Sequence, residues 1–256
     1  KWRSQTLRLR PGTQKTRIRT VKLSVLVPVY NEERTLEEIV RRVCAINIPK
    51  ELILVDDGSK DRSREILTRL HEENRRAGDA LNEIKIFFQP QNEGKGSALK
   101  TALDHVTGDV VMIQDADLEY DPKDYPSLLQ PIQEGVADVV YGTRFAGGGA
   151  HRVHFFWHSM GNRMLTLLSN MLTNLNLSDM EVGYKVFRAD ILKGINLESK
   201  RFGFEPEITV KLAKKGCRFY EVPISYYGRT YQEGKKITWK DGLAALYYMI
   251  RFRFGS

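Results

Sequence analysis

Residues 23–33 read Leu-Ser-Val-Leu-Val-Pro-Val-Tyr-Asn-Glu-Glu, an apolar run that passes directly into polar residues. Four further short apolar runs follow it, and segments of helix length separate one run from the next. Strands that alternate with helices in this way predict an α/β fold with a mostly parallel central sheet flanked by helices. The expected strands are residues 23–29, 52–55, 84–88, 110–113 and 139–141.

Two of the expected helices have recognisable polar starts. Thr35, with Glu38 three residues later, forms a capping-box pattern ahead of an apolar stripe that is typical of an amphipathic helix. Ser59 or Asp61 can cap the next helix, and residues 96–106 supply a third.

Polar and glycine-rich segments follow four of the expected strands. Ligands of parallel α/β sheets bind at the carboxyl ends of the strands, so these segments predict a binding crevice at one edge of the sheet. The segments are residues 28–32, 56–59, 92–96 and 115–117.

Asp115 and Asp117, one residue apart at a strand end, can hold a divalent cation, and Glu119 can complete the shell. Such a cation bridges diphosphate oxygens and neutralises the charge on a departing nucleotide. Turns after strands also favour Asp for local hydrogen bonds, so the motif alone leaves a structural role open.

Asp57 and Lys95 are candidates for contact with a nucleotide. Asp57 can accept hydrogen bonds from a base edge or a ribose, or it can cap the following helix, and Gly58 lets the backbone turn closely around it. Residues 94–97, Gly-Lys-Gly-Ser, lack the earlier glycine of a Walker phosphate loop, because Gln89 stands there. What they offer is a helix N-terminus with one lysine, suited to a phosphate or a sugar hydroxyl.

Four motifs, in this order and at these distances, resemble the family 2 glycosyltransferases of GT-A fold. They are residues 25–33, 55–59 (Val-Asp-Asp-Gly-Ser), 92–96 (Asn-Glu-Gly-Lys-Gly) and 115–117 (Asp-Ala-Asp). The resemblance covers nearly the whole chain after residue 20. Later segments are similar to polyprenyl-phosphate sugar transferases of the dolichol-phosphate mannose synthase type. These segments are residues 141–145, 178–188, 204–207 and 229–236.

The resemblance implies an inverting transfer of a hexose from GDP-mannose or UDP-glucose to a polyprenyl phosphate, such as dolichyl or undecaprenyl phosphate. It also implies Mg²⁺ or Mn²⁺ on Asp115, Asp117 and Glu119. Gln is frequent at position 119 in the mannose synthases, so Glu119 leaves the choice of sugar open. The expected contacts to the nucleotide sugar are Pro28, Tyr30, Glu32, Asp57, Lys95, Asp115 and Ala116.

Cationic side chains are expected to hold the acceptor. A lipid phosphate is already ionised near neutral pH, since a phosphate monoester has a second pKa of about 6, so it requires cations rather than a strong base. Arginine suits this role because its fork binds phosphate oxygens bidentately. The candidates are Arg144, Arg152, Arg229 and Lys235.

A hydroxyl acceptor, by contrast, must lose a proton as it attacks and so requires a positioned carboxylate or histidine. Asp179 is the first candidate, either as a base or as a residue that orients an arginine, and Glu205 and Glu207 come next. The predicted catalytic residues are Asp117, Arg144, Asp179 and Arg229.

Composition restricts the remaining possibilities. The chain has 256 residues, 41% of them hydrophobic, and a formal charge of +8, which suits one catalytic domain that attracts an anionic partner. The two cysteines give no disulfide framework, which fits a reducing cytoplasm. No run approaches the roughly 20 apolar residues that span a bilayer, so we expect a cytoplasmic protein, peripheral on the cytoplasmic face of a membrane.

Three regions are expected: a basic arm at residues 1–20, a GT-A domain at 21–236 and an amphipathic helix at 237–256. The arm can touch anionic lipid headgroups or be a solvated extension. The final helix, with aromatic side chains beside a basic flank, either lies in a membrane interface or packs on the domain. The aromatic and Met-rich stretch at 153–175 can receive a prenyl chain or fill the core.

Two other functions remain as alternatives. A family 2 transferase acting on a soluble or glycan hydroxyl would share the donor site but depend more on Asp179. A basic nucleic-acid-binding protein is the remote alternative, and no motif that reads RNA or DNA accompanies the charge, so no nucleic-acid partner is expected. The sequence leaves the oligomeric state undetermined.

Overall fold

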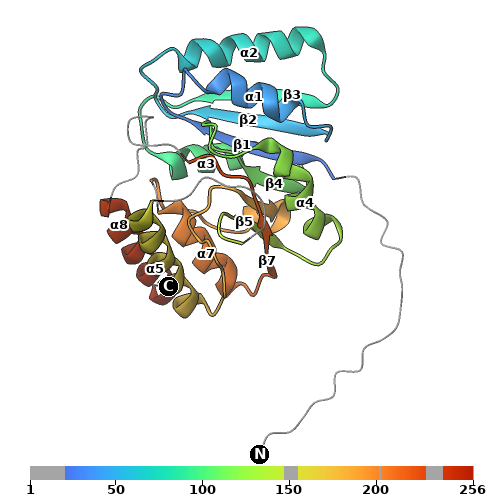
Figure 1. Ribbon diagram of the computed structural model, residues 1–256. Coiled ribbons are helices and arrows are strands. Elements are labelled where there is room, and N and C mark those ends of the chain that lie inside the picture. Colours follow the sequence, from blue (N-terminus) through green and yellow to red (C-terminus); the bar gives the residue numbers. More distant parts are fainter. Residues whose placement is uncertain (1–20, 147–154, 202, 229–238, 256) are drawn as a thin grey trace, which may run out of the picture.

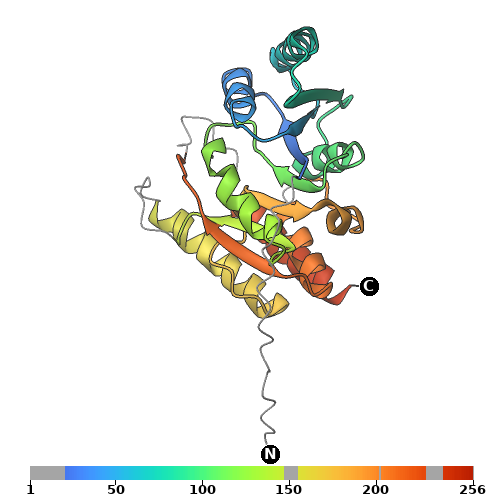
Figure 2. The same cartoon turned by 90° about the vertical axis from the view of Figure 1, so that its right-hand side faces the viewer.

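The structure is a computed structural model that describes residues 21–146, 155–201, 203–228 and 239–255. These residues form a seven-stranded sheet with helices on both faces (Figure 1, Figure 2). The strands are β1 (Leu23–Val29), β2 (Lys50–Asp56), β3 (Asn82–Phe88), β4 (Val110–Ile113), β5 (Val139–Thr143), β6 (Lys185–Arg188) and β7 (Phe219–Pro223).

The strand order is β3-β2-β1-β4-β6-β5-β7. Among the strands of the described residues, β6 alone is antiparallel to its neighbours, so the predicted α/β fold with a mostly parallel sheet is confirmed. All five predicted strands form. The apolar pattern does not predict β6 and β7, because β6 has only four residues and starts on a lysine, while no residue of β7 is fully buried.

Helices connect the strands, and strands β1, β2, β4 and β5 are buried almost throughout beneath them, which explains their continuous apolar runs. The helices are α1 (Leu36–Cys44), α2 (Ser63–Ala77), α3 (Lys95–Leu103), the 3₁₀ helix η1 (Pro122–Asp124), α4 (Tyr125–Gln133), α5 (Phe156–Thr173), α6 (Ala189–Lys193), α7 (Phe204–Lys214) and α8 (Trp239–Phe254).

The capping box predicted at the start of α1 does not form. Thr35 is the N-cap residue, but its side chain makes no capping hydrogen bond. Its hydroxyl lies 3.0 Å from the carbonyl oxygen of Ala116, and Glu38 pairs instead with Arg41 and Arg42. The start of α1 is therefore tied to the segment that follows β4.

The loops after β1 and β2 are joined by the two residues predicted to cap α2. Asp61 accepts a hydrogen bond from the backbone N–H of Ser63, the first residue of that helix, at 3.0 Å. Ser59 does not cap the helix; its hydroxyl accepts from the backbone N–H of Asn31 at 3.0 Å. The second carboxylate oxygen of Asp61 accepts from the backbone N–H of Glu33 at 3.1 Å, so Asp61 and Ser59 both hold the two loops together at the carboxyl edge of the sheet.

The chain changes direction across the sheet at β1, which pairs with β2 on one side and with β4 on the other. Ligands of α/β sheets bind at such a switch point, outside the carboxyl ends of the strands. The segments after β1 and β4 are therefore placed to form a site.

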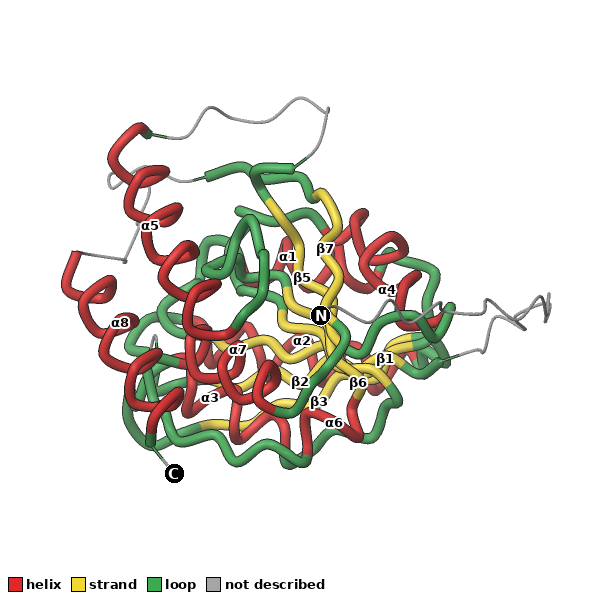
Figure 3. The backbone as a smooth tube through the Cα atoms, turned by 90° about the horizontal axis from the view of Figure 1, so that it is seen from below, coloured by secondary structure: helices red, strands yellow, loops and turns green. Residues whose placement is uncertain are grey.

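Helices α5 and α8 lie side by side and both pack on α7 (Figure 1, Figure 3). Each exposes a stripe of large apolar side chains with the spacing of one helix face. Met249 and Phe252 of α8 are buried, so its opposite face packs on the domain. The exposed stripes are Met160, Met164, Leu167 and Met171 on α5, and Leu243, Tyr247, Ile250 and Phe254 on α8. No helix in the described residues combines the length and the apolar character needed to cross a bilayer.

Candidate active site

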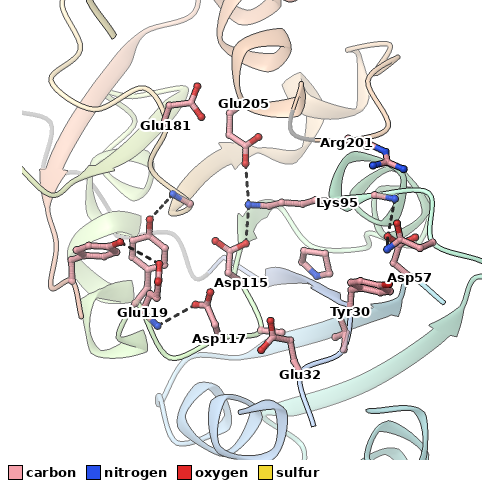
Figure 4. A pocket seen from close by; sticks show the side chains of 18 of the residues that line it. Tyr30, Glu32, Asp57, Lys95, Asp115, Asp117, Glu119, Glu181, Arg201 and Glu205 are labelled. Atoms are coloured by element: carbon pink, nitrogen blue, oxygen red, sulfur yellow. Dashed lines mark hydrogen bonds and ion pairs between the residues drawn. The ribbon is translucent and has the colours of Figure 1, made fainter. Parts of the chain in front are cut away.

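A cavity of about 460 Å³ opens at the carboxyl edge of the sheet, beside the ends of β1 and β4 (Figure 4). One part of its wall comes from the segments that follow β1, β2, β3 and β4. The C-terminal half of the chain contributes the rest, through Gly183, Arg201 and Glu205 among others. The cavity thus lies where the strand order predicts a ligand.

The backbone of Asp115 is held by Gln114, a fully buried residue. The side-chain amide of Gln114 donates to the carbonyl oxygen of Asp115 at 3.0 Å, and its oxygen accepts from the hydroxyls of Tyr125 (2.7 Å) and Tyr184 (2.8 Å). Gly183 lies against the Asp115 carboxylate, and there is no room for a Cβ atom at this glycine. These contacts determine where the Asp115 side chain enters the cavity.

Lys95, the first residue of α3, bridges two carboxylates. Its Nζ lies 2.8 Å from Oδ1 of Asp115 and 3.0 Å from Oε1 of Glu205 (Figure 4). Burial lowers the pKa of Lys95, but the charges of Asp115 and Glu205 outweigh burial and raise the pKa above its ordinary value. The lysine therefore carries a positive charge in the middle of the cavity.

Asp57 organises the loop after β3. Its carboxylate accepts from the side-chain amide of Asn92 at 2.9 Å and from the backbone N–H groups of Glu93 and Gly94, both at 2.8 Å. Burial raises the pKa of Asp57, although these hydrogen bonds oppose the shift. Asp57 therefore does not cap α2. A nucleotide bound by Asp57 would contact a carboxylate that also holds the loop after β3.

Arg144 follows β5 and reaches the cavity, where Asp179 holds it from behind. Nε and Nη2 of Arg144 lie 2.6 Å from Oδ2 and 2.7 Å from Oδ1 of Asp179, and the backbone N–H of Arg144 donates to Oδ2 at 3.2 Å. Asn162 donates to Oδ1 at 3.1 Å. Asp179 is fully buried. The guanidinium carbon of Arg144 lies 5.1 Å from the centre of the Tyr226 ring.

Asp117 and Glu119 line the cavity beside Asp115. Oδ1 of Asp117 accepts from the backbone N–H of Glu119 at 3.1 Å, and the Tyr226 hydroxyl donates to Glu119 at 3.3 Å. Mg²⁺ and Mn²⁺ prefer carboxylate oxygens, so the donor set fits such an ion. In the described part of the chain no three acidic, His or Cys side chains gather around one metal position. A cation here would complete its shell with diphosphate oxygens and water, as Mg²⁺ usually does.

Glu181 and Glu205 bring two further carboxylates to the cavity. Burial, reinforced by the charge of Glu205, raises the pKa of Glu181 to about 7. Lys185 on β6 is fully buried nearby and donates to the carbonyl oxygen of Val182. Burial lowers the pKa of Lys185 to about 8.

The structure brings ten of the predicted site residues together. They are Pro28, Tyr30, Glu32, Asp57, Lys95, Asp115, Ala116, Asp117, Glu119 and Arg144, all of which line the cavity. Asp179 lies behind Arg144 instead. The predictions for Arg152, Arg229 and Lys235 fall outside the described residues.

Sequence reasoning misses four residues whose ionisable side chains also line the cavity: Tyr120, Glu181, Arg201 and Tyr226. Three of them stand in no motif, because they reach the cavity only through the tertiary fold. Glu181 does lie within the motif at residues 178–188, and that position is the one signal that could have found it.

The arrangement of strands and helices is the GT-A fold, which the solved structures of glucosyl-3-phosphoglycerate synthase share. The sequence model of Glycosyl transferase family 2 matches residues 24–195, and the chain belongs to this family. The predicted resemblance and the prediction of a glycosyltransferase are confirmed.

Two relatives are named undecaprenyl-phosphate 4-deoxy-4-formamido-L-arabinose transferase. The protein from Yersinia enterocolitica serotype O:8 is 29% identical over 218 residues, which cover 84% of this chain and 62% of the relative. The protein from Edwardsiella ictaluri is 30% identical over 217 residues, which cover 83% of this chain and 62% of the relative. The chain therefore spans less than two thirds of the length of these relatives.

Crystal structures of glucosyl-3-phosphoglycerate synthase from Mycobacterium tuberculosis share the fold. The complex with Mn²⁺, UDP and glucosyl-3-phosphoglycerate has a TM-score of 0.67 at 19% identity, over 92% of this chain and 80% of that one. The complex with Mg²⁺ and UDP has a TM-score of 0.65 at 18% identity, over the same shares of both chains. At this level of identity the likeness establishes the fold alone.

Proposed function

We propose that the protein transfers a sugar from a nucleoside diphosphate sugar to the phosphate of a polyprenyl lipid such as undecaprenyl phosphate. Family membership and the two relatives named for transfer to undecaprenyl phosphate support the proposal. The observation that carries it is the ion pair of Arg144 with Asp179. Both oxygens of Asp179 are already engaged, so this carboxylate orients an arginine rather than accepting a proton. An acceptor that arrives ionised needs no base at this position.

The donor is proposed to lie across the cavity with its base and ribose near Tyr30 and Asp57. Asp115, Asp117 and Lys95 then come beside the diphosphate (Figure 4). A cavity of about 460 Å³ falls within the range of small-molecule sites, roughly 300–1,000 Å³. GDP-mannose and UDP-glucose remain the proposed donors, and the names of the relatives add 4-deoxy-4-formamido-L-arabinose as a candidate sugar.

Asp117 and Glu119 are the proposed main ligands of a divalent cation, because Lys95 already neutralises much of the charge of Asp115. When bound, Mg²⁺ or Mn²⁺ would neutralise negative charge on the departing diphosphate. The complexes of the structural neighbours with Mn²⁺ or Mg²⁺ and UDP support this use of a metal.

The proposed reaction is a single displacement at the anomeric carbon. A phosphate oxygen of the lipid forms the new bond, the bond from the anomeric carbon to the diphosphate oxygen breaks, and the nucleoside diphosphate leaves with the bonding electrons. The configuration therefore inverts, and no proton has to move. Asp179 engages Nε and Nη2 of Arg144, so the other N–H groups of the guanidinium can bind the acceptor phosphate.

The apolar stripes of α5 and α8 are proposed to rest on the cytoplasmic face of a membrane that holds the lipid. Contiguous exposed apolar side chains mark interaction surfaces, and Arg253 supplies positive charge in the last turn of α8, where Arg251 pairs with Glu198. Leu167→Glu should therefore weaken binding to vesicles that contain phosphatidylglycerol. Leu81→Glu, which charges an exposed leucine on the loop before β3, is the matched control and should bind as the unmodified protein does. Equal binding by both variants would refute this part of the proposal.

A hydroxyl acceptor is the second candidate, and Glu181 is the observation that favours it. A carboxylate in the cavity with a pKa near 7 is suited to general base catalysis. In that case product would form without any lipid phosphate.

The deciding experiment follows a radiolabelled sugar from UDP-glucose or GDP-mannose, with and without undecaprenyl phosphate, in Mn²⁺ or in EDTA. We expect label in the organic phase only when lipid phosphate and metal are both present. Arg144→Ala should abolish this transfer. Arg218→Ala is the control, because it breaks an arginine–carboxylate pair with Asp138 that lies outside the cavity. This variant should still transfer the sugar. Transfer that is indifferent to lipid phosphate would refute the first candidate.

A further inference from the structure

Glu205, near the start of α7, presents an unused carboxylate oxygen inside the cavity. Its Oε1 is bound by Lys95 at 3.0 Å, whereas Oε2 is buried and has no hydrogen-bond partner among the described residues. The side chain is 7% exposed, and its carboxylate points toward the middle of the cavity (Figure 4). A buried carboxylate oxygen without a partner is unfavourable, so this atom is suited to a donor group on a ligand.

Glu181 supplies a second buried carboxylate oxygen of this kind from a different segment of the chain. It precedes β6, it lines the same cavity, and its Oε1 is likewise buried without a partner in the described residues. Both glutamates lie across Lys95 and Asp115 from Tyr30 and Asp57 (Figure 4). A donor whose base lies at Tyr30 and whose diphosphate lies at Lys95 would therefore place its sugar next to them.

We infer that Glu205 and Glu181 form the sugar subsite of the donor and accept hydrogen bonds from hydroxyl or amide N–H groups of a neutral sugar. The inference rests on the proposed function, since it assumes a nucleoside diphosphate sugar in the cavity. Hydrogen bonds to a charged acceptor are stronger than those between neutral groups, so the Glu205 carboxylate, and that of Glu181 above pH 7, select a sugar with donors in reach.

The same two carboxylates exclude donors that carry an acidic sugar. A uronic acid would bring a further carboxylate beside Glu205, and above pH 7 beside an ionised Glu181 as well, and like charges at such short range in a buried site repel strongly. The subsite thus selects neutral hexoses or pentoses against uronic acids. Lys95 does not offset this repulsion, because Asp115 and Glu205 already share its charge.

Titration calorimetry tests the subsite by comparing three ligands: UDP, UDP-glucose and UDP-glucuronic acid, with GDP and GDP-mannose as a second set. In the unmodified protein we expect the neutral sugar to strengthen binding over the nucleotide alone and the uronic acid to weaken it. Glu205→Gln and Glu181→Gln should each lower, by about tenfold, the ratio of the affinity for the neutral-sugar nucleotide to the affinity for the nucleotide alone. Both variants should leave the affinity for the nucleotide within about twofold and should bind the uronic acid better.

Glu51→Gln is the matched control, because Glu51 is fully buried but is bound by Lys85 and Ser24 and does not line the cavity. In this control, the ratio of the affinity for UDP-glucose to the affinity for UDP should stay the same. Melting curves of all variants check that each one is folded.

Three results would overturn the inference, and they differ from one another. A sugar contribution that is unchanged in Glu205→Gln and Glu181→Gln refutes the subsite while the proposed function stands. An equal loss for UDP and UDP-glucose shows that Glu205 acts only through Lys95 on the diphosphate. Binding of no nucleotide at all refutes the proposed function itself, and the subsite with it.

Discussion

Replacement of Asp179 by Asn tests whether this carboxylate positions Arg144. The pair is buried, since Asp179 has no exposed surface and the Arg144 side chain is 14% exposed. Removal of one partner from a buried ion pair costs about 3–5 kcal/mol, because the remaining charge loses its counter-ion. A domain of this length loses about 2–4 °C of melting temperature per kcal/mol, so we expect Asp179→Asn to melt about 6–20 °C lower. A total stability above the low end of the usual range of about 5–15 kcal/mol leaves the variant largely folded at 25 °C, and urea unfolding of the unmodified protein measures where it lies in this range.

Urea unfolding measures the stability of this variant, and transfer to undecaprenyl phosphate measures its activity. A positioning role predicts that the KM for the lipid phosphate rises about tenfold or more, while the affinity for the donor nucleotide stays the same. The double variant Arg144→Ala with Asp179→Ala should lose less stability than the sum of the two single variants, because both charges leave together. Unchanged stability and unchanged acceptor KM in Asp179→Asn would refute this reasoning. A fall in kcat alone, reversed at high pH, would instead identify Asp179 as a base.

Three further predictions concern the cavity. Asp117→Asn should lower the rate of sugar transfer about 100-fold or more and should remove the part of UDP binding that depends on Mn²⁺. Calorimetry of UDP binding with and without Mn²⁺ measures the second effect. UDP binding that still depends on Mn²⁺ in this variant would exclude Asp117 as a metal ligand. Gly183→Ala sets a methyl group against the Asp115 carboxylate and the Tyr120 ring, so urea unfolding should show a loss of about 1–3 kcal/mol, and an unaffected variant would show that the segment can move aside. Folding raises the pKa of Glu181 from 4.5 to about 7, so its stabilising contribution is complete below pH 4.5 and is lost as pH rises through 7. Glu181→Gln should flatten this fall in urea unfolding between about pH 5 and 8, and an unchanged slope would contradict the assignment.

The central sheet is predictable because its signals are local. Apolar runs indicate five of the strands, and the polar segments that follow them indicate the ligand-binding edge. Ten predicted residues meet in one cavity because parallel strands bring their carboxyl ends to the same edge of the sheet. Strands β6 and β7 are not predicted, since their short segments acquire strand structure from their neighbours rather than from an apolar pattern.

The role of Asp179 shows the limit of local reasoning. The sequence leaves open whether Asp179 is a base or the partner of an arginine, because a motif does not show which side chains the carboxylate contacts. The fold brings it against Arg144 and Asn162, which engage both of its oxygens. The predicted capping box of α1 is wrong for a similar reason: the Thr35 hydroxyl donates to a carbonyl oxygen 81 positions away, at Ala116.

The sequence by itself thus determined the family, the sheet and the edge of the sheet at which the cavity lies, because these follow from periodicity and from motifs within a few residues. Only the tertiary structure decided how the charges of the site are shared. Lys95 meets Asp115 and Glu205 across long separations in the chain, and Glu181 reaches the cavity from the segment before β6. Such distances and burial depend on how whole elements pack, and no local pattern of residues contains them.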